Sequence, residues 1–116
     1  MKRLMLIVVL MYSSSSFAAE FTGYVEEIAI HSDSWGTYNE NDAAMLSIYM
    51  EGMPLGCGMS NGTNRVAIRT SHPLFNATLS LVIAAKMAGK QLQVTYLNTC
   101  NTRSGVWDFG YISLKE

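Results

Sequence analysis

Five short segments of the chain, most of them with apolar and polar residues alternating at a period of two, predict five β-strands. The segments are 21–30, 46–51, 65–69, 91–96 and 107–114. In the first, Glu26 and Glu27 interrupt the alternation, so we expect a β-bulge there. The fifth segment is apolar on both faces, with Trp107, Phe109 and Tyr111 on one and Ile112 and Leu114 on the other.

A period of three and four residues follows the third segment and predicts an α-helix over residues 73–88. Ser71 or His72 can cap its start, and Gly89 is placed to end it. The residues at this spacing are Leu74, Phe75, Leu79, Val82, Ile83, Lys86 and Met87. Five more, Ala77, Leu81, Ala84, Ala85 and Ala88, widen the apolar surface beyond one stripe. The excess is expected to bury against neighbouring subunits or to embed the helix deeply in its own domain.

The order strand, strand, strand, helix, strand, strand is that of the OB-fold, a Greek-key barrel of five strands. We therefore expect an α+β domain that is mainly β, an OB-fold-like barrel with one disulfide. The same order also fits an open antiparallel sheet with one helix, which stays the alternative.

Residues 1–19 have the pattern of a secretory signal peptide. Lys2 and Arg3 precede an apolar run over 4–12, and small residues lead up to Ala19. The run is too short to cross a bilayer, which takes about 20 apolar residues. Cleavage is expected after Ala18 or Ala19. It would leave one domain over residues 20–116, exported to the periplasm or the extracellular medium and not inserted in the membrane.

The net charge limits the classes of partner that this domain can bind, and its cysteine content indicates the compartment in which it folds. Removal of Lys2 and Arg3 leaves six basic residues against nine acidic ones. This balance argues against nucleic acid and anionic membranes as partners. The chain has two cysteines, Cys57 and Cys100. In an oxidising compartment such a pair in a small domain is expected to form a disulfide.

The sequence offers little catalytic machinery. It has no G-x-S-x-G nucleophile turn, no glycine-rich phosphate loop and no calcium-loop spacing of acidic residues. His31 and His72 are each expected to be structural or solvated. We therefore predict that the chain is not an enzyme and holds no cofactor or metal.

Two predicted loops have a composition suited to sugar binding. In OB-folds the loops after the first and fourth strands often hold oligosaccharides. The first, residues 32–42, contains Asp33, Ser34, Trp35, Tyr38 and Asn39. The second, residues 97–105, contains Asn98, Asn101 and Arg103 and is followed by Trp107. Aromatic faces flanked by amide, carboxyl and hydroxyl groups can bind a saccharide. Surface loops in general share this composition, and Trp35 can instead cover the end of the core.

Three short stretches carry a resemblance to a known family. Glu20-Phe-Thr-Gly after the leader resembles the Glu-Trp-Thr-Gly start of the B subunits of subtilase cytotoxin and its typhoid-toxin relatives. Gly-Cys57-Gly-Met is similar to their Cys-Ser-Met context. The helix followed by Gly89-Lys-Gln-Leu-Gln-Val-Thr-Tyr is similar to their helix and Gly-Gln-x-Val-Arg-Ile-x-Tyr.

The resemblance implies an OB-fold B subunit that forms a ring of five through helix 73–88 and binds sialylated or related cell-surface glycans. No sugar-contacting residue of that family aligns with a defined position here. The segment between Cys57 and the helix is shorter, or the helix longer, and the family's cysteine-bearing C-terminal region has no counterpart. The leading hypothesis is an exported, glycan-binding, B-subunit-like domain that forms homo-oligomers. The second is a standalone periplasmic or secreted domain with a structural or protein-interaction role.

Overall fold

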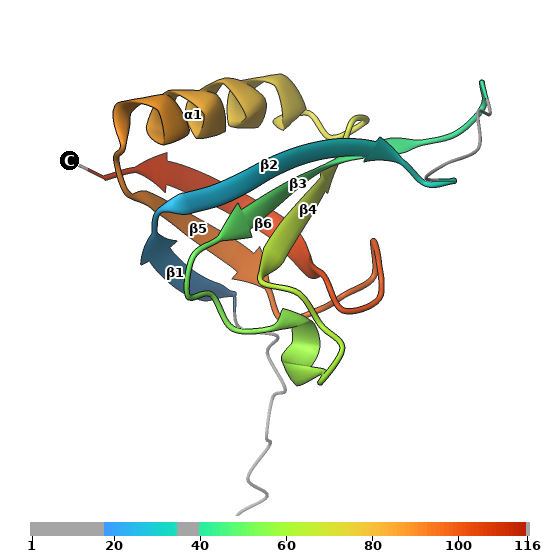
Figure 1. The fold of residues 1–116 in the computed structure, drawn as a ribbon. Helices are drawn as coiled ribbons and strands as arrows, with labels where there is room; N and C mark the ends of the chain where they lie inside the picture. Colours follow the sequence, from blue (N-terminus) through green and yellow to red (C-terminus); the bar gives the residue numbers. More distant parts are fainter. Residues whose placement is uncertain (1–17, 35–39, 116) are drawn as a thin grey trace, which may run out of the picture.

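The computed structural model describes residues 18–34 and 40–115. Within them the chain forms six strands, one α-helix and one short 3-10 helix (Figure 1). The strands are β1 (Ala19–Gly23), β2 (Val25–Ser32), β3 (Ala44–Met50), β4 (Arg65–Arg69), β5 (Leu92–Leu97) and β6 (Trp107–Leu114). The helices are α1 (Phe75–Ala88) and the short η1 (Gly56–Gly58). The predicted third and fifth strands are confirmed with the same bounds, and the second and fourth are shifted by one or two residues.

The first predicted strand is in fact two strands. β1 pairs with β5, β2 pairs with β3, and Tyr24 alone separates them. One continuous segment therefore supplies both edges of a single sheet. The predicted bulge is confirmed, because the β2–β3 register shifts between Val25 and Glu27.

The sheet is open, so the expected closed five-stranded barrel is wrong. Its strand order is β1-β5-β6-β4-β3-β2, and within the described residues no ladder joins β1 to β2. The sheet is also mixed, because β4 and β6 run parallel. In a flat sheet, five strand spacings of about 4.8 Å would hold the outer strands roughly 24 Å apart. The link from Gly23 to Val25 spans at most about 7 Å. The sheet must therefore curl strongly, as Figure 1 shows.

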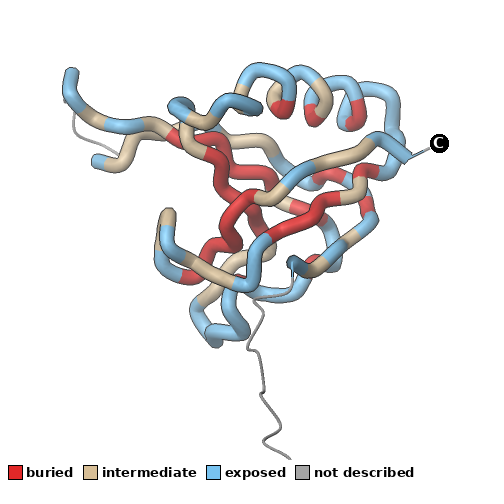
Figure 2. The backbone as a smooth tube through the Cα atoms, turned by 180° about the vertical axis from the view of Figure 1, so that it is seen from behind, coloured by how far each residue is buried: buried red, intermediate tan, exposed pale blue. Residues whose placement is uncertain are grey.

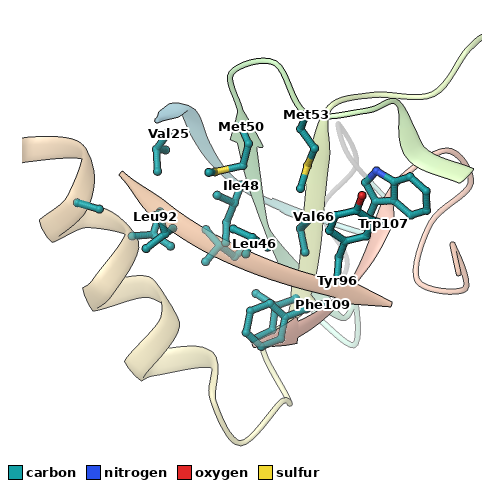
Figure 3. Packing of buried hydrophobic residues seen from close by; sticks show 14 residues of the cluster. Val25, Leu46, Ile48, Met50, Met53, Val66, Leu92, Tyr96, Trp107 and Phe109 are labelled. Atoms are coloured by element: carbon teal, nitrogen blue, oxygen red, sulfur yellow. The ribbon is translucent and has the colours of Figure 1, made fainter. Parts of the chain in front are cut away.

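The core lies between the concave face of the curled sheet and α1. Figure 2 shows buried residues along the middle of the strands and on the sheet-facing turns of α1. Figure 3 shows Leu46, Ile48 and Leu92 packed near the helix, with Tyr96 and Trp107 toward the other end of the cluster. The Tyr96 and Trp107 rings lie 4.5 Å apart between centroids. The core thus runs along β5 and β6 from one end to the other.

A second bulge places Tyr111 on a different face from the one predicted. Tyr96 pairs with Phe109 and Thr95 pairs with Tyr111, so Gly110 is an extra residue in β6. A Cβ at Gly110 would lie 2.4 Å from the carbonyl oxygen of Thr95, so the bulge requires glycine. Beyond it the alternation is reversed. Tyr111 is half exposed, whereas Trp107 and Phe109 are buried.

The helix starts two residues later than predicted and ends where expected. Residues 72–74 form a turn in which the backbone N–H of Leu74 donates to His72 Nδ1 at 3.0 Å. Gly89 adopts a left-handed conformation (φ 64°) at the C-terminal cap. Of the five residues that widen the apolar surface, Leu81 and Ala85 pack on the core, whereas Ala77, Ala84 and Ala88 are exposed. Ile83 and Met87 are exposed on the outward face of α1 as well. In the part of the chain that the structure describes, no helix has the length and apolar character needed to cross a membrane.

Candidate functional site

The disulfide predicted between Cys57 and Cys100 is present and joins two loops, with a Cα–Cα distance of 6.3 Å. It links the segment between β3 and β4 to the segment between β5 and β6. Next to it the two backbones are in direct contact. A Cβ at Gly56 would lie 2.1 Å from the carbonyl oxygen of Gly105, and the N–H of Thr63 donates to that oxygen at 2.9 Å. The loop 98–106 is therefore fixed to its neighbour by a covalent bond and by glycine packing.

The carboxylate of Asp108 fixes the same loop from the inside. It accepts hydrogen bonds from the backbone N–H groups of Asn101 and Thr102, both at 2.9 Å, and from the hydroxyl of Thr99. Burial raises the pKa of Asp108, but these hydrogen bonds outweigh it and hold the pKa below its ordinary value. An ionised carboxylate thus organises the turn that carries Asn101.

A cleft of about 380 Å³ lies between this loop, the end of β4 and the start of the helix. Its apolar part comes from Ala67, Ile68, Leu97 and Phe109. Its polar part comes from Arg69, Ser71, His72, Thr99, Asn101, Thr102 and Asp108. We call it the loop cleft. The His72 ring meets the Phe109 ring edge-on, with centroids 5.5 Å apart. The volume falls within the roughly 300–1,000 Å³ of small-ligand sites.

The start of the first predicted loop also reaches the loop cleft. Arg69 Nη1 donates to Asp33 Oδ2 at 3.1 Å, and Arg69 Nη2 lies 3.4 Å from the carbonyl oxygen of Thr102. Arg69 therefore bridges the two predicted loops. Asp42 closes the base of the first loop, because its Oδ2 accepts from the N–H of Ser34 at 2.8 Å.

The structure brings some of the predicted site residues together and separates others. Asn101 lines the loop cleft, and Asp33 joins it through Arg69. Asn98 and Arg103 belong to the same loop but do not line the cleft. Ser34 is exposed at the start of the first loop. The predicted residues Trp35, Tyr38 and Asn39 lie outside the described residues.

Trp107 belongs to the core and is not on a binding loop. It is 8% exposed, and its indole Nε1 donates to the carbonyl oxygen of Pro54 at 2.9 Å. Tyr96 stacks at a tilt against its ring. Its position directly after the polar loop suggested a ligand contact, but the first residue of β6 points into the cluster.

Asn101 is the one lining residue of the loop cleft that the sequence pointed to, and the residues missed include Arg69, His72 and Phe109. Arg69 ends β4, His72 precedes the helix, and Phe109 lies within β6. None of them belongs to the two loops that were considered. The signal available in the sequence was Arg69 itself, a charged residue at the end of an apolar strand.

The chain has no match among protein-family models, curated proteins or solved structures.

Within residues 18–34 and 40–115, no group of three or more His, Cys, Asp and Glu side chains could hold a metal ion.

Proposed function

We propose that the chain is a non-catalytic binding domain that takes a sugar unit of a glycan in the loop cleft. The proposal rests on the composition of this cleft. Its apolar surface at Phe109 lies beside Asn101 and the Arg69–Asp33 ion pair. An apolar floor can take the C–H face of a pyranose ring. An Asn amide both donates and accepts, and guanidinium donates, which suits ring hydroxyls.

The rigidity of the cleft supports this proposal. The disulfide and the Asp108 hydrogen bonds fix the loop that carries Asn101 before any ligand arrives. A preorganised site loses less conformational entropy when it binds, which matters for a weakly interacting ligand such as a sugar. The resemblance to toxin B subunits points to the same ligand class.

We also propose that the domain is exported and forms homo-oligomers through α1, in a ring of five as the resemblance implies. The outward face of the helix exposes Ile83 and Met87. Lys86, its basic residue, turns its Nζ to the carbonyl oxygens of Val25 and Glu26 at 3.2 and 2.9 Å. This face therefore lacks the charge of a solvated helix, and large exposed apolar residues favour association. The same face supports the second candidate, a standalone domain that docks another protein there.

A glycan-array screen of the purified mature protein tests the proposed ligand, with its mass in solution measured by light scattering. We expect selective glycan binding, lost in Asn101→Ala with an unchanged melting temperature. Asn76→Ala, on the exposed side of α1, is the matched control and should retain binding. A monomer that binds no glycan would refute both the ligand and the ring.

The candidates outside the described residues enter the same screen. Trp35→Ala should abolish binding without a large change in melting temperature if its ring stacks on the sugar. A large fall in melting temperature would instead show that Trp35 covers the core.

A further inference from the structure

The register of the sheet aligns three residues at the end far from the loop cleft. The outermost pairs there are Gly23 with Leu92 and Leu92 with Leu114. One position further out along β1, β5 and β6 are Tyr24, Gln91 and Lys115. The ladder continues between Gln91 and Lys115, because the N–H of Lys115 donates to the carbonyl oxygen of Gln91 at 3.1 Å, whereas the carbonyl oxygen of Tyr24 accepts from the N–H of Glu51 at 3.0 Å. Three chain segments that are distant in sequence thus place these side chains in one row.

Lys90 joins this row from the end of the helix. Its N–H donates to the carbonyl oxygen of Ala85 at 3.0 Å, in the turn that Gly89 makes after α1. Its backbone is therefore fixed by the helix cap. The four residues Tyr24, Lys90, Gln91 and Lys115, with Ala88 and Gly89, line a cleft of about 320 Å³. We call it the lysine cleft. Tyr24, which lines this cleft, is 48% exposed.

The side chains of Lys90 and Lys115 lack the partners that the other described lysine and arginine side chains have. Arg69 pairs with Asp33, Arg65 donates to Tyr49 Oη at 2.8 Å, and Lys86 donates to backbone carbonyls. Arg103 also has a partner. Within the described residues, Lys90 and Lys115 make no ion pair and no side-chain hydrogen bond. Among the residues that the structure describes, no carboxylate lines their cleft.

The C-terminus of α1 can stabilise the charge of Lys90 but not that of Lys115. A cation at a helix C-terminus is stabilised by the helix dipole, which accounts for Lys90. Lys115 comes from the end of β6 and is brought to the same cleft by strand pairing. Two ammonium groups that share one cleft repel each other, and the domain as a whole is acidic. An anion between them would remove that repulsion and accept hydrogen bonds from both.

We propose that the lysine cleft is a second binding site, for an oxyanion carried on a small polar ligand. The ammonium groups of Lys90 and Lys115 hold the carboxylate, phosphate or sulfate group. The exposed ring of Tyr24 packs against the body of the ligand. This site shares no residue with the loop cleft, so it stands or falls independently of the proposed function.

The test is an NMR titration of the ¹⁵N-labelled mature protein at constant ionic strength. One arm uses sodium glucuronate, a carboxylated sugar, and the other uses inorganic phosphate. We expect saturable shifts confined to the amides of Gly89, Lys90, Gln91 and Lys115. In the double variant Lys90→Gln/Lys115→Gln the affinity should fall about tenfold or more, since two charge-assisted contacts are lost.

A charge-matched control separates a site from a general effect of net charge. Ser60→Glu/Asn61→Glu, at two exposed residues between η1 and β4 that line neither cleft, changes the net charge by the same two units and should leave the titration unchanged. Equal saturation by both anions would show that charge alone is recognised. A preference for glucuronate that Tyr24→Ala abolishes would show that the ring also contributes. Shifts that stay linear, spread over the surface or persist in the double lysine variant would overturn the proposal.

Discussion

The two clefts lie at opposite ends of β5 and β6 and use their charges in opposite ways. In the loop cleft Arg69 is neutralised by Asp33, and Asp108 is occupied by the turn it organises. In the lysine cleft Lys90 and Lys115 have no such partners in the described chain. A ligand in the loop cleft would therefore be recognised by shape and hydrogen bonding, and a ligand in the lysine cleft by charge. Binding in the lysine cleft should weaken more steeply as salt is added.

The clefts also differ in how their walls are held. A disulfide and glycine contacts tie the loop cleft to a neighbouring loop. The lysine cleft is built on regular elements, the end of α1 and the ends of three strands. Changes at the loop end should therefore alter one cleft and leave the other intact, and the following predictions use this separation.

The largest effect is expected from Trp107→Ala. Removing a buried Trp costs about 3–5 kcal/mol of folding free energy, because a cavity is left in the core. Trp107 is almost fully buried and hydrogen-bonded to Pro54. Urea denaturation measures the loss. Trp107→Phe, which keeps an aromatic ring in the core, should lose clearly less. If the variant kept its stability but lost ligand binding, Trp107 would have to be a ligand contact and not a core residue.

The double variant Cys57→Ala/Cys100→Ala should lose about 2–4 kcal/mol, the usual contribution of a disulfide. The bridge spans 43 residues of sequence. Urea denaturation again gives the free energy. NMR spectra should show displaced amides for Asn101 and Thr102 in the loop cleft, with those of Lys90 and Lys115 unchanged. Displacement at both clefts would contradict their separation.

Asp108→Asn should cost about 1.5–3 kcal/mol at pH 7, since hydrogen bonds to a charged acceptor are lost. The folded-state pKa of Asp108 lies below its unfolded value of about 3.9. The ionised carboxylate therefore stabilises the fold fully above that value, and its contribution disappears as the pH falls through the folded pKa. Denaturation at pH 7 and at successively lower pH should show the gap between wild type and variant closing in acid. A constant gap would exclude this carboxylate as the cause.

The sequence predicts those features of the fold that are determined by residues close together in the chain. β4 and β6 are predicted with their bounds because alternation within a few residues sets them. The division of the first predicted strand at Tyr24 is not predicted, because it arises from the pairing of β1 with β5 and of β2 with β3. The reversal at Tyr111 has the same origin. Gly110 is visible in the sequence, but the bulge is fixed by the register with Thr95.

The lining of the loop cleft could be predicted only in part, for the same reason. A polar turn after β5 is a local feature, and it identified Asn101. Arg69 and Phe109 reach the loop cleft through the parallel pairing of β4 and β6, which no local pattern indicates. The lysine cleft is still less predictable, because Lys90 and Lys115 are 25 positions apart and are brought together by the cap of α1 and by the pairing of β5 with β6.

The smallest effect on stability, about 0.2–1 kcal/mol, is expected from Asp33→Asn, because its ion pair with Arg69 is partly exposed. Its effect on binding is more informative. Without Asp33 the guanidinium of Arg69 loses its counter-charge, and the loop cleft becomes electrostatically similar to the lysine cleft. Phosphate titration should then produce saturable, salt-sensitive shifts at the amides of Arg69 and Thr102 that the wild type lacks.

Asp42→Asn is the matched control for this variant. It removes one negative charge from the base of the same loop, where Asp42 accepts from the N–H of Ser34, while the ion pair of Arg69 is with Asp33. It should leave the response of Arg69 to phosphate as in the wild type. If Asp33→Asn also leaves it unchanged, neutralisation by Asp33 is not what distinguishes the clefts. The difference would then lie in the carbonyl of Thr102, which holds Arg69 from the other side and which no side-chain substitution removes.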